Sequence, residues 1–247
     1  MLRFLKAFDG ELRPLCGDNY ASHVIEALTQ ESYKRMFVKT ESSDEFRQFT
    51  IKIGRFLLNN MEDFVWDTYA NHITRRVLRI YARIPDEKNG GSSSSIDTET
   101  GEWPVEYEEI VKDYGERLLT WPQFFELPYS EITSGLLQVL VSAVSRVDSK
   151  MLKRYVRKLN KECFVVESKP TDDDAVKGNS VKVFTSKPAV MLLETVLEVA
   201  TPKLLSKVYA ACFSSRLVSL ATSRGANFAV QKLLFHCTDR IEVSLRV

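Results

Sequence analysis

The chain has 247 residues, of which 44% are hydrophobic and 27% charged, and its formal net charge is +1. This length and apolar content suffice for a sizeable core in one or two domains, and the near-zero net charge excludes a global basic bias. With only 10 glycines and 8 prolines, and no sustained alternation of apolar and polar residues, the sequence favours an all-α protein. No apolar run is as long as a membrane span and no signal peptide opens the chain, so we expect an intracellular protein that does not contact membranes.

Five helices are predicted in chain order, and each carries a similar window of five residues, here called a pentad. The pentads occupy residues 22–26, 71–75, 134–138, 190–194 and 227–231. Four residues before each pentad stands a side chain that can accept a hydrogen bond from a free backbone N–H at a helix start. These predicted caps are Asp18, Asp67, Ser130, Ser186 and Ser223. The recurrence predicts one array of helical repeats over residues 1–247.

The pentads divide each of these helices into an apolar side and a polar side. With the first residue of a pentad as position zero, positions two, three and six are apolar in nearly every copy, as at Val24, Ile25 and Leu28. At about 100° per residue, these positions lie on the opposite side of the helix from positions zero, one and four. We therefore expect positions two, three and six to pack, and positions zero, one and four to be free.

The last repeat shows the predicted layout of three helices. A cap followed by proline, Thr201 and Pro202, predicts the start of the first helix, and a short second helix is expected near residues 215–222. The side chains expected to face inward are Leu204, Leu205, Val208, Phe213, Leu217, Leu220 and Ala221. Equivalent second-helix positions in earlier repeats are Leu12, Leu15, Met61, Phe64, Phe124 and Leu127. Stacked three-helix repeats form a curved α-solenoid whose third helices share a concave face.

Two segments lengthen the array between pentads. Only the interval between the last two pentads matches the roughly 35–40 residues of a compact three-helix repeat. Residues 86–102 are rich in glycine, serine and acidic residues, and residues 168–180 contain Pro170 and three consecutive aspartates, so both are predicted to be flexible loops. A longer helix around residues 43–59 accounts for the excess between the first two pentads.

Two pentads carry side chains that can match the edge of a nucleobase. Asn227 and Gln231 each offer one acceptor and a pair of donors, which suits the alternating edge of uracil. Glu26 can accept from two adjacent N–H groups, as guanine presents, and Ser22 stands beside it at position zero. The alternative for Asn227 and Gln231 is that they only cap or solvate a helix.

Position one carries an aromatic ring in three pentads. His23, His72 and Phe228 can stack on bases, and the alternatives are structural histidines and a core phenylalanine. The remaining candidate RNA contacts are Asn71, Arg75, Ser134, Gln138 and Glu194. Three pentads depart from the regular pattern of polar and aromatic residues. They have an arginine at position four (Arg75), a glycine at position one (Gly135), and the pair Val190–Met191, which favours packing. Recognition of shape and single strands is therefore favoured over a code of one base per repeat.

Two groups of cations are candidate phosphate contacts. The helix predicted over residues 150–161 places six cations on one side with no acid among them, opposite Leu152, Tyr155, Val156 and Leu159. The candidate contacts in this helix are Lys153, Arg154, Arg157 and Lys158. A second group consists of Arg75, Arg76, Arg79 and Arg83, of which Arg76 and Arg79 are further candidates. A solvated face is an equally weighted interpretation of the first group, whereas phosphate contact would make the affinity depend on salt.

At these residues the sequence resembles a known family. Capped third helices with pentads such as 22–26 and 227–231 resemble Pumilio-type (PUF) RNA-binding repeats. The segments 18–26, 64–72 and 202–234 narrow the resemblance to the divergent Pumilio-like family of nucleolar protein nine. That resemblance implies a factor of the nucleolus or nucleus that binds precursor small-subunit (18S) ribosomal RNA, takes part in rRNA processing and small-subunit biogenesis, and has proteins of the pre-ribosomal small-subunit particle as partners.

Other functions fit the sequence less well. An enzyme is disfavoured because three histidines, no metal-ligand spacing and no phosphate-cradling glycine loop leave no catalytic residue, metal or cofactor to expect. Four distant cysteines favour free thiols. A protein-binding armadillo- or HEAT-like solenoid explains the repeats but not the amides and rings, and a cytoplasmic Pumilio-type regulator of messenger RNA is expected to have more regular pentads. We expect a monomer and, because neither end has the polar face of a terminal repeat, a piece of a longer array.

Overall fold

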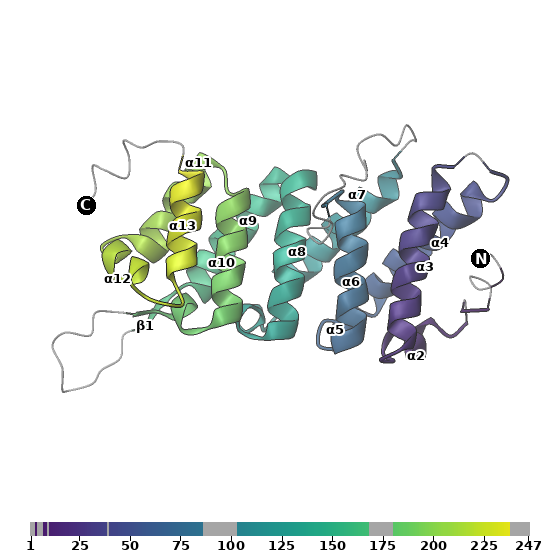
Figure 1. Ribbon diagram of the computed structural model, residues 1–247, viewed down its shortest axis with the longest axis horizontal. Helices are drawn as coiled ribbons and strands as arrows, with labels where there is room; N and C mark the ends of the chain where they lie inside the picture. Colours follow the sequence, from purple (N-terminus) through teal and green to yellow (C-terminus); the bar gives the residue numbers. More distant parts are fainter. Residues whose placement is uncertain are drawn as a thin grey trace. The chain divides into compact units, whose positions relative to one another are not determined.

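The computed structural model describes residues 10–38, 40–85, 103–167 and 180–237, together with Arg3, Ala7 and Phe8. This part of the chain is helical almost throughout (Figure 1), which confirms the all-α prediction. A short exception was not predicted, since β1 (Val166–Glu167) pairs antiparallel with β2 (Ser180–Val181). The flexible loop predicted over 86–102 lies outside the described residues, as does the one predicted over 168–180 except for Ser180, which begins β2. Among the helices that are described, none is both long and apolar enough to cross a membrane.

The chain divides into two compact units, residues 1–117 and 118–247. The first unit contains α2 (Leu12–Cys16), α3 (Ala21–Met36), α4 (Ser43–Asn59), α5 (Met61–Phe64), α6 (Thr68–Tyr81) and most of α7 (Val105–Leu119). The long helix predicted around 43–59 is confirmed as α4. Because α3 packs against both α4 and α6, the helices that carry the first two pentads are direct neighbours.

Two aspartates start the pentad helices of the first unit, as predicted. Asp18 Oδ1 accepts from the backbone N–H groups of Tyr20 at 2.9 Å and Ala21 at 2.8 Å. Asp67 Oδ1 accepts from the backbone N–H groups of Tyr69 at 2.9 Å and Ala70 at 2.7 Å. Each carboxylate therefore satisfies two of the N–H groups that have no partner within the helix. The bonds from Ala21 and Tyr20 also lower the pKa of Asp18.

Two stacked tyrosines hold the core of the first unit together. The rings of Tyr81 on α6 and Tyr107 on α7 are parallel, with centroids 4.0 Å apart. Tyr81 Oη donates to the backbone oxygen of Thr50 on α4, and the Thr50 hydroxyl is 2.5 Å from Tyr107 Oη. Gly54, one turn further along α4, leaves the room that the Tyr81 ring occupies, because a Cβ there would lie 2.7 Å from Tyr81 Cε2.

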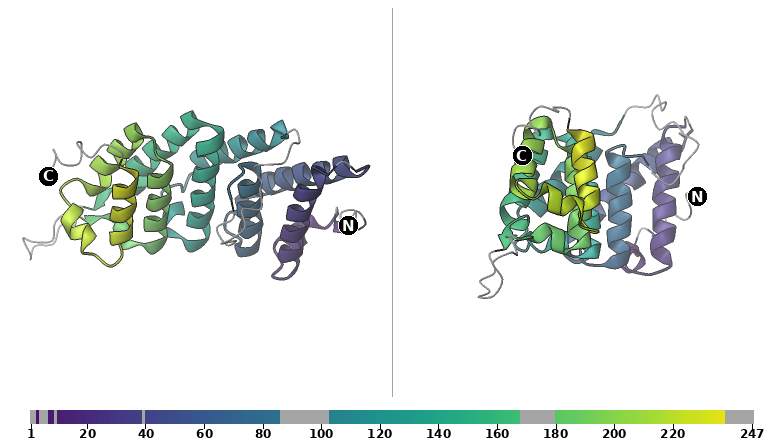
Figure 2. Two further views of the ribbon diagram at one scale, coloured as in Figure 1. Left: turned by 45° about the horizontal axis from the view of Figure 1, so that its top comes forward. Right: turned by 60° about the vertical axis from the view of Figure 1, so that its left-hand side comes forward.

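The second unit contains two layers of helices. Its elements after α7 are η2 (Leu127–Tyr129), α8 (Glu131–Val147), α9 (Ser149–Lys158), η3 (Leu159–Cys163), η4 (Lys182–Thr185), α10 (Lys187–Val199), α11 (Pro202–Val208), η5 (Tyr209–Phe213), α12 (Leu217–Ala221) and α13 (Asn227–His236). The pentad helices α8, α10 and α13 lie side by side, with α9 and α11 behind them (Figures 1 and 2). The η3 and η5 segments continue α9 and α11 as π-helical turns.

The three-helix layout of the last repeat is confirmed, with one difference. Its first helix begins at Pro202 and buries Leu204, Leu205, Val208 and Phe213, as expected. In the short second helix Leu220 is buried and Leu217 is half-buried, but Ala221 is exposed, so Ala221 was assigned inward wrongly. The equivalent side chains of earlier repeats are buried as predicted at Leu12, Met61, Phe64, Phe124 and Leu127, whereas Leu15 is half-buried.

The three serines predicted as caps do not cap through their side chains. Ser130 and Ser186 have the extended backbone of an N-cap but make no side-chain cap hydrogen bond. At Ser223 the backbone oxygen, and not the hydroxyl, accepts from the N–H of Asn227 at 3.0 Å. Asp148 was not predicted as a cap, yet its carboxylate accepts from two backbone N–H groups at the start of α9. A longer, charged acceptor makes this bond where the serine hydroxyls do not.

The cysteines are free thiols, as expected. Cys16, Cys163 and Cys212 are buried and Cys237 is half-buried. Burial raises the pKa of the first three to about 12, which removes their reactivity near neutral pH. Within the described residues no three histidine, cysteine or acidic side chains are grouped so that they could hold a metal ion.

Candidate nucleic-acid interface

Position zero of the pentads is mostly buried, which corrects the expectation that it is free. The buried side chains, each at most 5% exposed, are Ser22, Asn71, Ser134 and Val190. Asn71 Nδ2 donates to the backbone oxygen of Val65 at 2.9 Å, and Ser134 Oγ donates to that of Pro188 at 2.7 Å. Side chains near a helix start tilt toward its N-terminus, so position zero points into the preceding turn or the neighbouring helix. These residues anchor the helices against one another.

Asn227 is the half-buried member at position zero. Its Oδ1 atom is buried and accepts no hydrogen bond from the described residues. Four residues later Gln231 is exposed, whereas Gln138 in the third pentad donates to Ser134 Oγ at 3.2 Å. The last pentad therefore keeps acceptor and donor capacity that the third pentad uses internally.

Position one is exposed wherever it carries a ring. His23 and His72 are exposed, and Phe228 is 59% exposed, which rules out the alternative that Phe228 is a core residue. Val190 packs as expected, but Met191 is 45% exposed, so its assignment to packing was wrong. An aromatic side chain held open to solvent on a rigid helix is a platform on which a base can stack.

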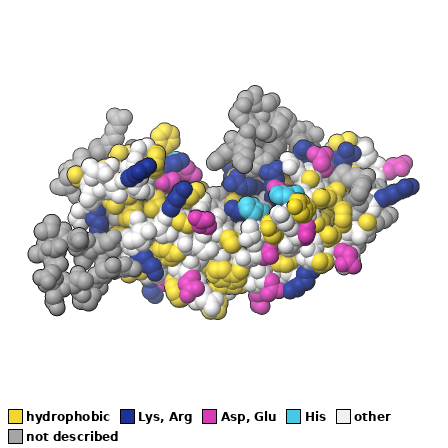
Figure 3. Space-filling view, turned by 60° about the horizontal axis from the view of Figure 1, so that its bottom comes forward, with side chains coloured by type: hydrophobic (Ala, Val, Ile, Leu, Met, Phe, Trp, Pro, Cys, Tyr) yellow, Lys and Arg dark blue, Asp and Glu magenta, His cyan; other side chains and the backbone are white. Residues whose placement is uncertain are grey.

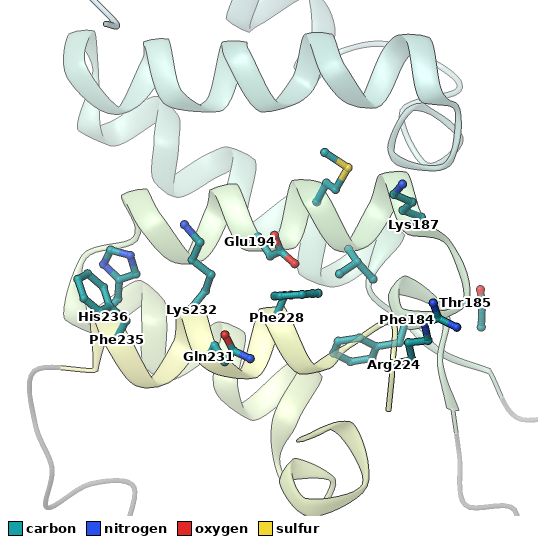
Figure 4. Close-up of a pocket in the computed structure, with 13 residues that line it drawn as sticks. Phe184, Thr185, Lys187, Glu194, Arg224, Phe228, Gln231, Lys232, Phe235 and His236 are labelled. Atoms are coloured by element: carbon teal, nitrogen blue, oxygen red, sulfur yellow. The ribbon is translucent and has the colours of Figure 1, made fainter. Parts of the chain in front are cut away.

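A groove of about 890 Å³ runs between η4–α10 and α13 (Figure 4). Its walls combine four aromatic rings, aliphatic side chains, the polar side chains Glu194 and Gln231, and several cations. The lining residues are Phe184, Thr185, Lys187, Val190, Met191, Glu194, Arg224, Gly225, Phe228, Gln231, Lys232, Phe235 and His236. The structure thus brings together the predicted site residues Glu194, Phe228 and Gln231 from two successive repeats.

Charged groups stand at both ends of the groove. Figure 4 shows the Phe228 ring between α10 and α13, with Lys187 and Arg224 toward one end and Lys232 and His236 toward the other. Lys232 forms an ion pair with Glu198, which ties α13 to α10. Burial raises the pKa of Glu194, Lys232 lowers it and Glu198 raises it. Glu194 is therefore a carboxylate whose charge is partly desolvated and available to N–H donors.

Several lining residues were not predicted. Phe235 stands four residues after Gln231 on α13, so it follows from helical periodicity once that helix is placed. Arg224 lies in the turn before α13, where helical periodicity does not apply. Phe184 lies in η4, outside any pentad, and nothing local in the sequence marks it. Its ring packs edge-on against Phe213, with centroids 5.7 Å apart. Only the tertiary packing of the last repeat places Phe184 at the groove.

Four of the predicted site residues of the first unit contact one another, one pair within α6 and one pair between α3 and α6. Arg75 Nη2 is 2.7 Å from Nδ1 of the His72 ring, and Arg76 Nε is 3.7 Å from Glu26 Oε1. Burial lowers the pKa of His72, as does Arg75, whereas Glu26 raises it. Figure 3 shows histidine side chains beside arginine and lysine side chains on the surface. We call His72, Arg75, Arg76 and Glu26 the α3–α6 cluster.

The cations predicted as phosphate contacts fall into two classes. Lys153, Arg154 and Arg157 are exposed on α9, but Lys158 pairs with Glu162 at 3.1 Å and lies over the Phe124 ring. Residues 150–161 contain no acid, as expected, but Glu162, which follows them, pairs with the cation Lys158. In the first unit Arg79 is half-buried, and the Arg83 guanidinium lies 4.0 Å from the centre of the Trp103 ring.

Comparisons with known proteins identify the fold. A model of the family described as NOP9-like PUF repeat domain matches residues 1–244. The structure of APUM23 with GGAAUUGACGG is similar over 98% of this chain and 45% of the APUM23 chain, with 18% sequence identity and a TM-score of 0.69. The structure with GGAUUUGACGG is similar over the same shares of the two chains, with 17% identity and a TM-score of 0.70. The form of APUM23 with its insert region deleted has 17% identity, TM-score 0.68 and 43% of that chain covered. This chain therefore spans less than half the length of these three structures. No curated protein sequence matches it. The predicted α-solenoid of Pumilio-like three-helix repeats is confirmed.

Proposed function

The chain belongs to the NOP9-like PUF repeat domain family, and on that premise we propose that it binds single-stranded RNA in the groove between α10 and α13. One observation carries this proposal. The exposed Phe228 ring stands inside the groove with Gln231 beside it on α13 and Glu194 facing it from α10. A ring, an amide and a carboxylate in one groove match the stacking face and the hydrogen-bonding edge of a base.

Each part of the groove has a role in this proposal. The Phe228 ring stacks on a base, which contributes about 1–3 kcal/mol in comparable sites. Gln231 offers donors and an acceptor to the base edge, and Glu194 accepts from base N–H groups. Lys187 and Arg224 lie at one end of the groove, where they can contact phosphates. A volume of about 890 Å³ is within the range of sites that enclose a small organic ligand, so the groove suits one or two nucleotides.

The test is a titration of the protein with labelled single-stranded RNA at moderate salt. We expect Phe228→Ala/Gln231→Ala to weaken binding at least tenfold, because the stack and the base-edge contacts are both lost. Phe125→Ala is the matched control, since Phe125 is 45% exposed in the same unit and does not line the groove. Equal weakening by both variants, or no RNA binding together with binding of a protein partner, would refute the proposal in favour of a protein-binding solenoid.

We further propose that the RNA is a precursor of small-subunit (18S) ribosomal RNA, that the protein acts in the nucleolus with proteins of the small-subunit precursor particle, and that it is a monomer. Membership of the NOP9-like family supports this proposal. Additional support comes from APUM23, whose solved structures contain GGAAUUGACGG and related sequences. Competition between fragments of precursor 18S RNA and messenger RNA fragments of equal length tests it. Preference for the messenger RNA would favour a cytoplasmic regulator instead.

A further inference from the structure

A second basic surface lies away from the groove, on helices that contribute no lining residue. In α9 the side chains of Lys150, Lys153 and Arg157 are exposed, whereas the apolar side of the helix, including Leu152 and Val156, is buried. Seven residues of α-helix rise about 10 Å, so these three cations form a row along the helix. No acidic residue occurs within α9.

The neighbouring helix α11 extends this row. α11 packs beside α9 in the same layer of the second unit (Figures 1 and 2), and it too buries its apolar side at Leu204 and Leu205. Its Lys203 and Lys207 are exposed, and α11 contains no acidic residue. Because both helices turn their apolar sides inward, their exposed cations lie on one outward surface. We call Lys150, Lys153, Arg157, Lys203 and Lys207 the α9–α11 surface.

The acids nearest in sequence to this surface are engaged elsewhere. The Asp148 carboxylate accepts from the backbone N–H groups of Lys150 and Met151, and so serves as the cap of α9. Glu162 pairs with Lys158, which also lies over the Phe124 ring. The structure thus leaves the α9–α11 surface strongly positive in a chain whose formal net charge is only +1.

We propose that the α9–α11 surface is a second RNA contact, which binds the phosphate backbone and does not read bases. The surface offers cations but none of the exposed aromatic side chains on which bases stack or proteins anchor. Cations on long flexible stems suit a regular row of phosphates. The surface therefore adds affinity for any RNA strand, while sequence preference resides in the α10–α13 groove.

The salt dependence of affinity tests this proposal. For single strands the slope of log K against log salt concentration changes by about 0.7 for each phosphate contact. We expect Lys150→Gln/Lys153→Gln/Arg157→Gln to reduce the slope by about 2 and to weaken binding of a homopolymeric RNA about tenfold or more at low salt. Lys34→Gln/Arg35→Gln/Lys112→Gln removes the same charge from the first unit and is the control. Lys150→Arg/Lys153→Arg/Arg157→Lys keeps the charges and is expected to retain the slope.

The two RNA surfaces can fail independently. If Phe228→Ala/Gln231→Ala abolishes sequence preference but keeps the salt slope, and the α9 variant does the reverse, both proposals stand. If the α9 variant has the same slope as the charge-matched control, the second contact is refuted, whatever the result at the groove. The proposal is also overturned if the α9 variant loses binding to polyglutamate but not to RNA, because the surface would then be a site for acidic proteins.

Discussion

The α10–α13 groove and the α3–α6 cluster use the same positions of the repeat in opposite ways. Between α10 and α13, Phe228 and Gln231 are exposed in an open groove. On α6 Arg75 is hydrogen-bonded to His72, and Arg76 of α6 is paired with Glu26 of α3. A side chain that already has an internal partner gains less from a ligand than one that has none. Pentad chemistry alone therefore does not identify a binding site, because neighbouring pentads can satisfy each other.

Because position zero is mostly buried, the difference between the α10–α13 groove and the α3–α6 cluster depends on positions one and four. Asn71 Nδ2 and Ser134 Oγ donate to backbone oxygens and hold helices in place. The Oδ1 atoms of Asn71 and Asn227 are both buried without a hydrogen-bond partner among the described residues. A buried acceptor left unpaired costs about 1–3 kcal/mol. A ligand N–H that reaches Asn227 would recover part of that energy. Asn227 differs from Asn71 in being half-buried, whereas Asn71 is fully buried.

The largest expected effect is a loss of stability when the core of the first unit alone is disturbed. Gly54→Ala places a Cβ 2.7 Å from Tyr81 Cε2 and 2.8 Å from Tyr81 Cζ, and the buried tyrosine is stacked on Tyr107. We expect a net loss of about 2–3 kcal/mol of stability, because overpacking and a disturbed buried hydrogen bond outweigh the higher helix propensity of alanine. Thermal denaturation measures it, with Gly10→Ala, which meets no atom within 4 Å, as the control. Equal melting of both variants would contradict the packing argument.

The next effect compares the two stacking rings directly. Phe228→Ala should cost about 2 kcal/mol of RNA affinity, roughly thirtyfold, since an open stacking platform is lost. His72→Ala should cost less than tenfold, because the ring is already hydrogen-bonded to Arg75. Fluorescence titrations with the same RNA measure both losses. A larger loss at His72 than at Phe228 would place the main contact in the first unit.

A smaller change in RNA affinity is expected when an acid of the α3–α6 cluster is removed, because that acid holds a cation of the same cluster. Glu26→Gln releases Arg76 from an ion pair, and such pairs contribute about 0–1 kcal/mol. We expect a gain in RNA affinity of up to about fivefold. Glu108→Gln, which removes an acid paired with Lys112 on α7, is the charge-matched control. A loss of affinity on Glu26→Gln would instead show that Glu26 reads a base, as the sequence predicts.

The smallest effect concerns pH. Burial, and then Arg75, lower the pKa of His72, so the folded protein binds this proton less readily than the unfolded chain. The stability from neutral His72 is present above the ordinary histidine pKa near 6.5 and decreases as the pH falls through that value. The melting temperature should therefore decrease slightly from pH 7.5 to pH 6.0, and His72→Gln should remove that part of the decrease. His236→Gln is the control, and an unchanged slope in His72→Gln would exclude the effect.

Much of the fold could be predicted from local pattern. Helical periodicity predicted α4, the five pentad helices and the inward side chains of α11, because apolar residues recur every three to four positions along one side of a helix. Asp18 and Asp67 cap as predicted, since their acceptors reach N–H groups only two or three residues away. The three serine caps were predicted wrongly, because Ser130 and Ser186 make no side-chain cap hydrogen bond and at Ser223 the backbone oxygen accepts instead of the hydroxyl.

The sequence by itself determined which side chains stand on each helix and in which order, and therefore the repeat family. Only the tertiary structure decided which of them remain free. Contact between neighbouring helices buries position zero, pairs Arg76 with Glu26, and brings Phe184 from η4 to the same groove as Phe228. These partners lie far apart in sequence, and their distances are set by how helices pack, which no local spacing encodes.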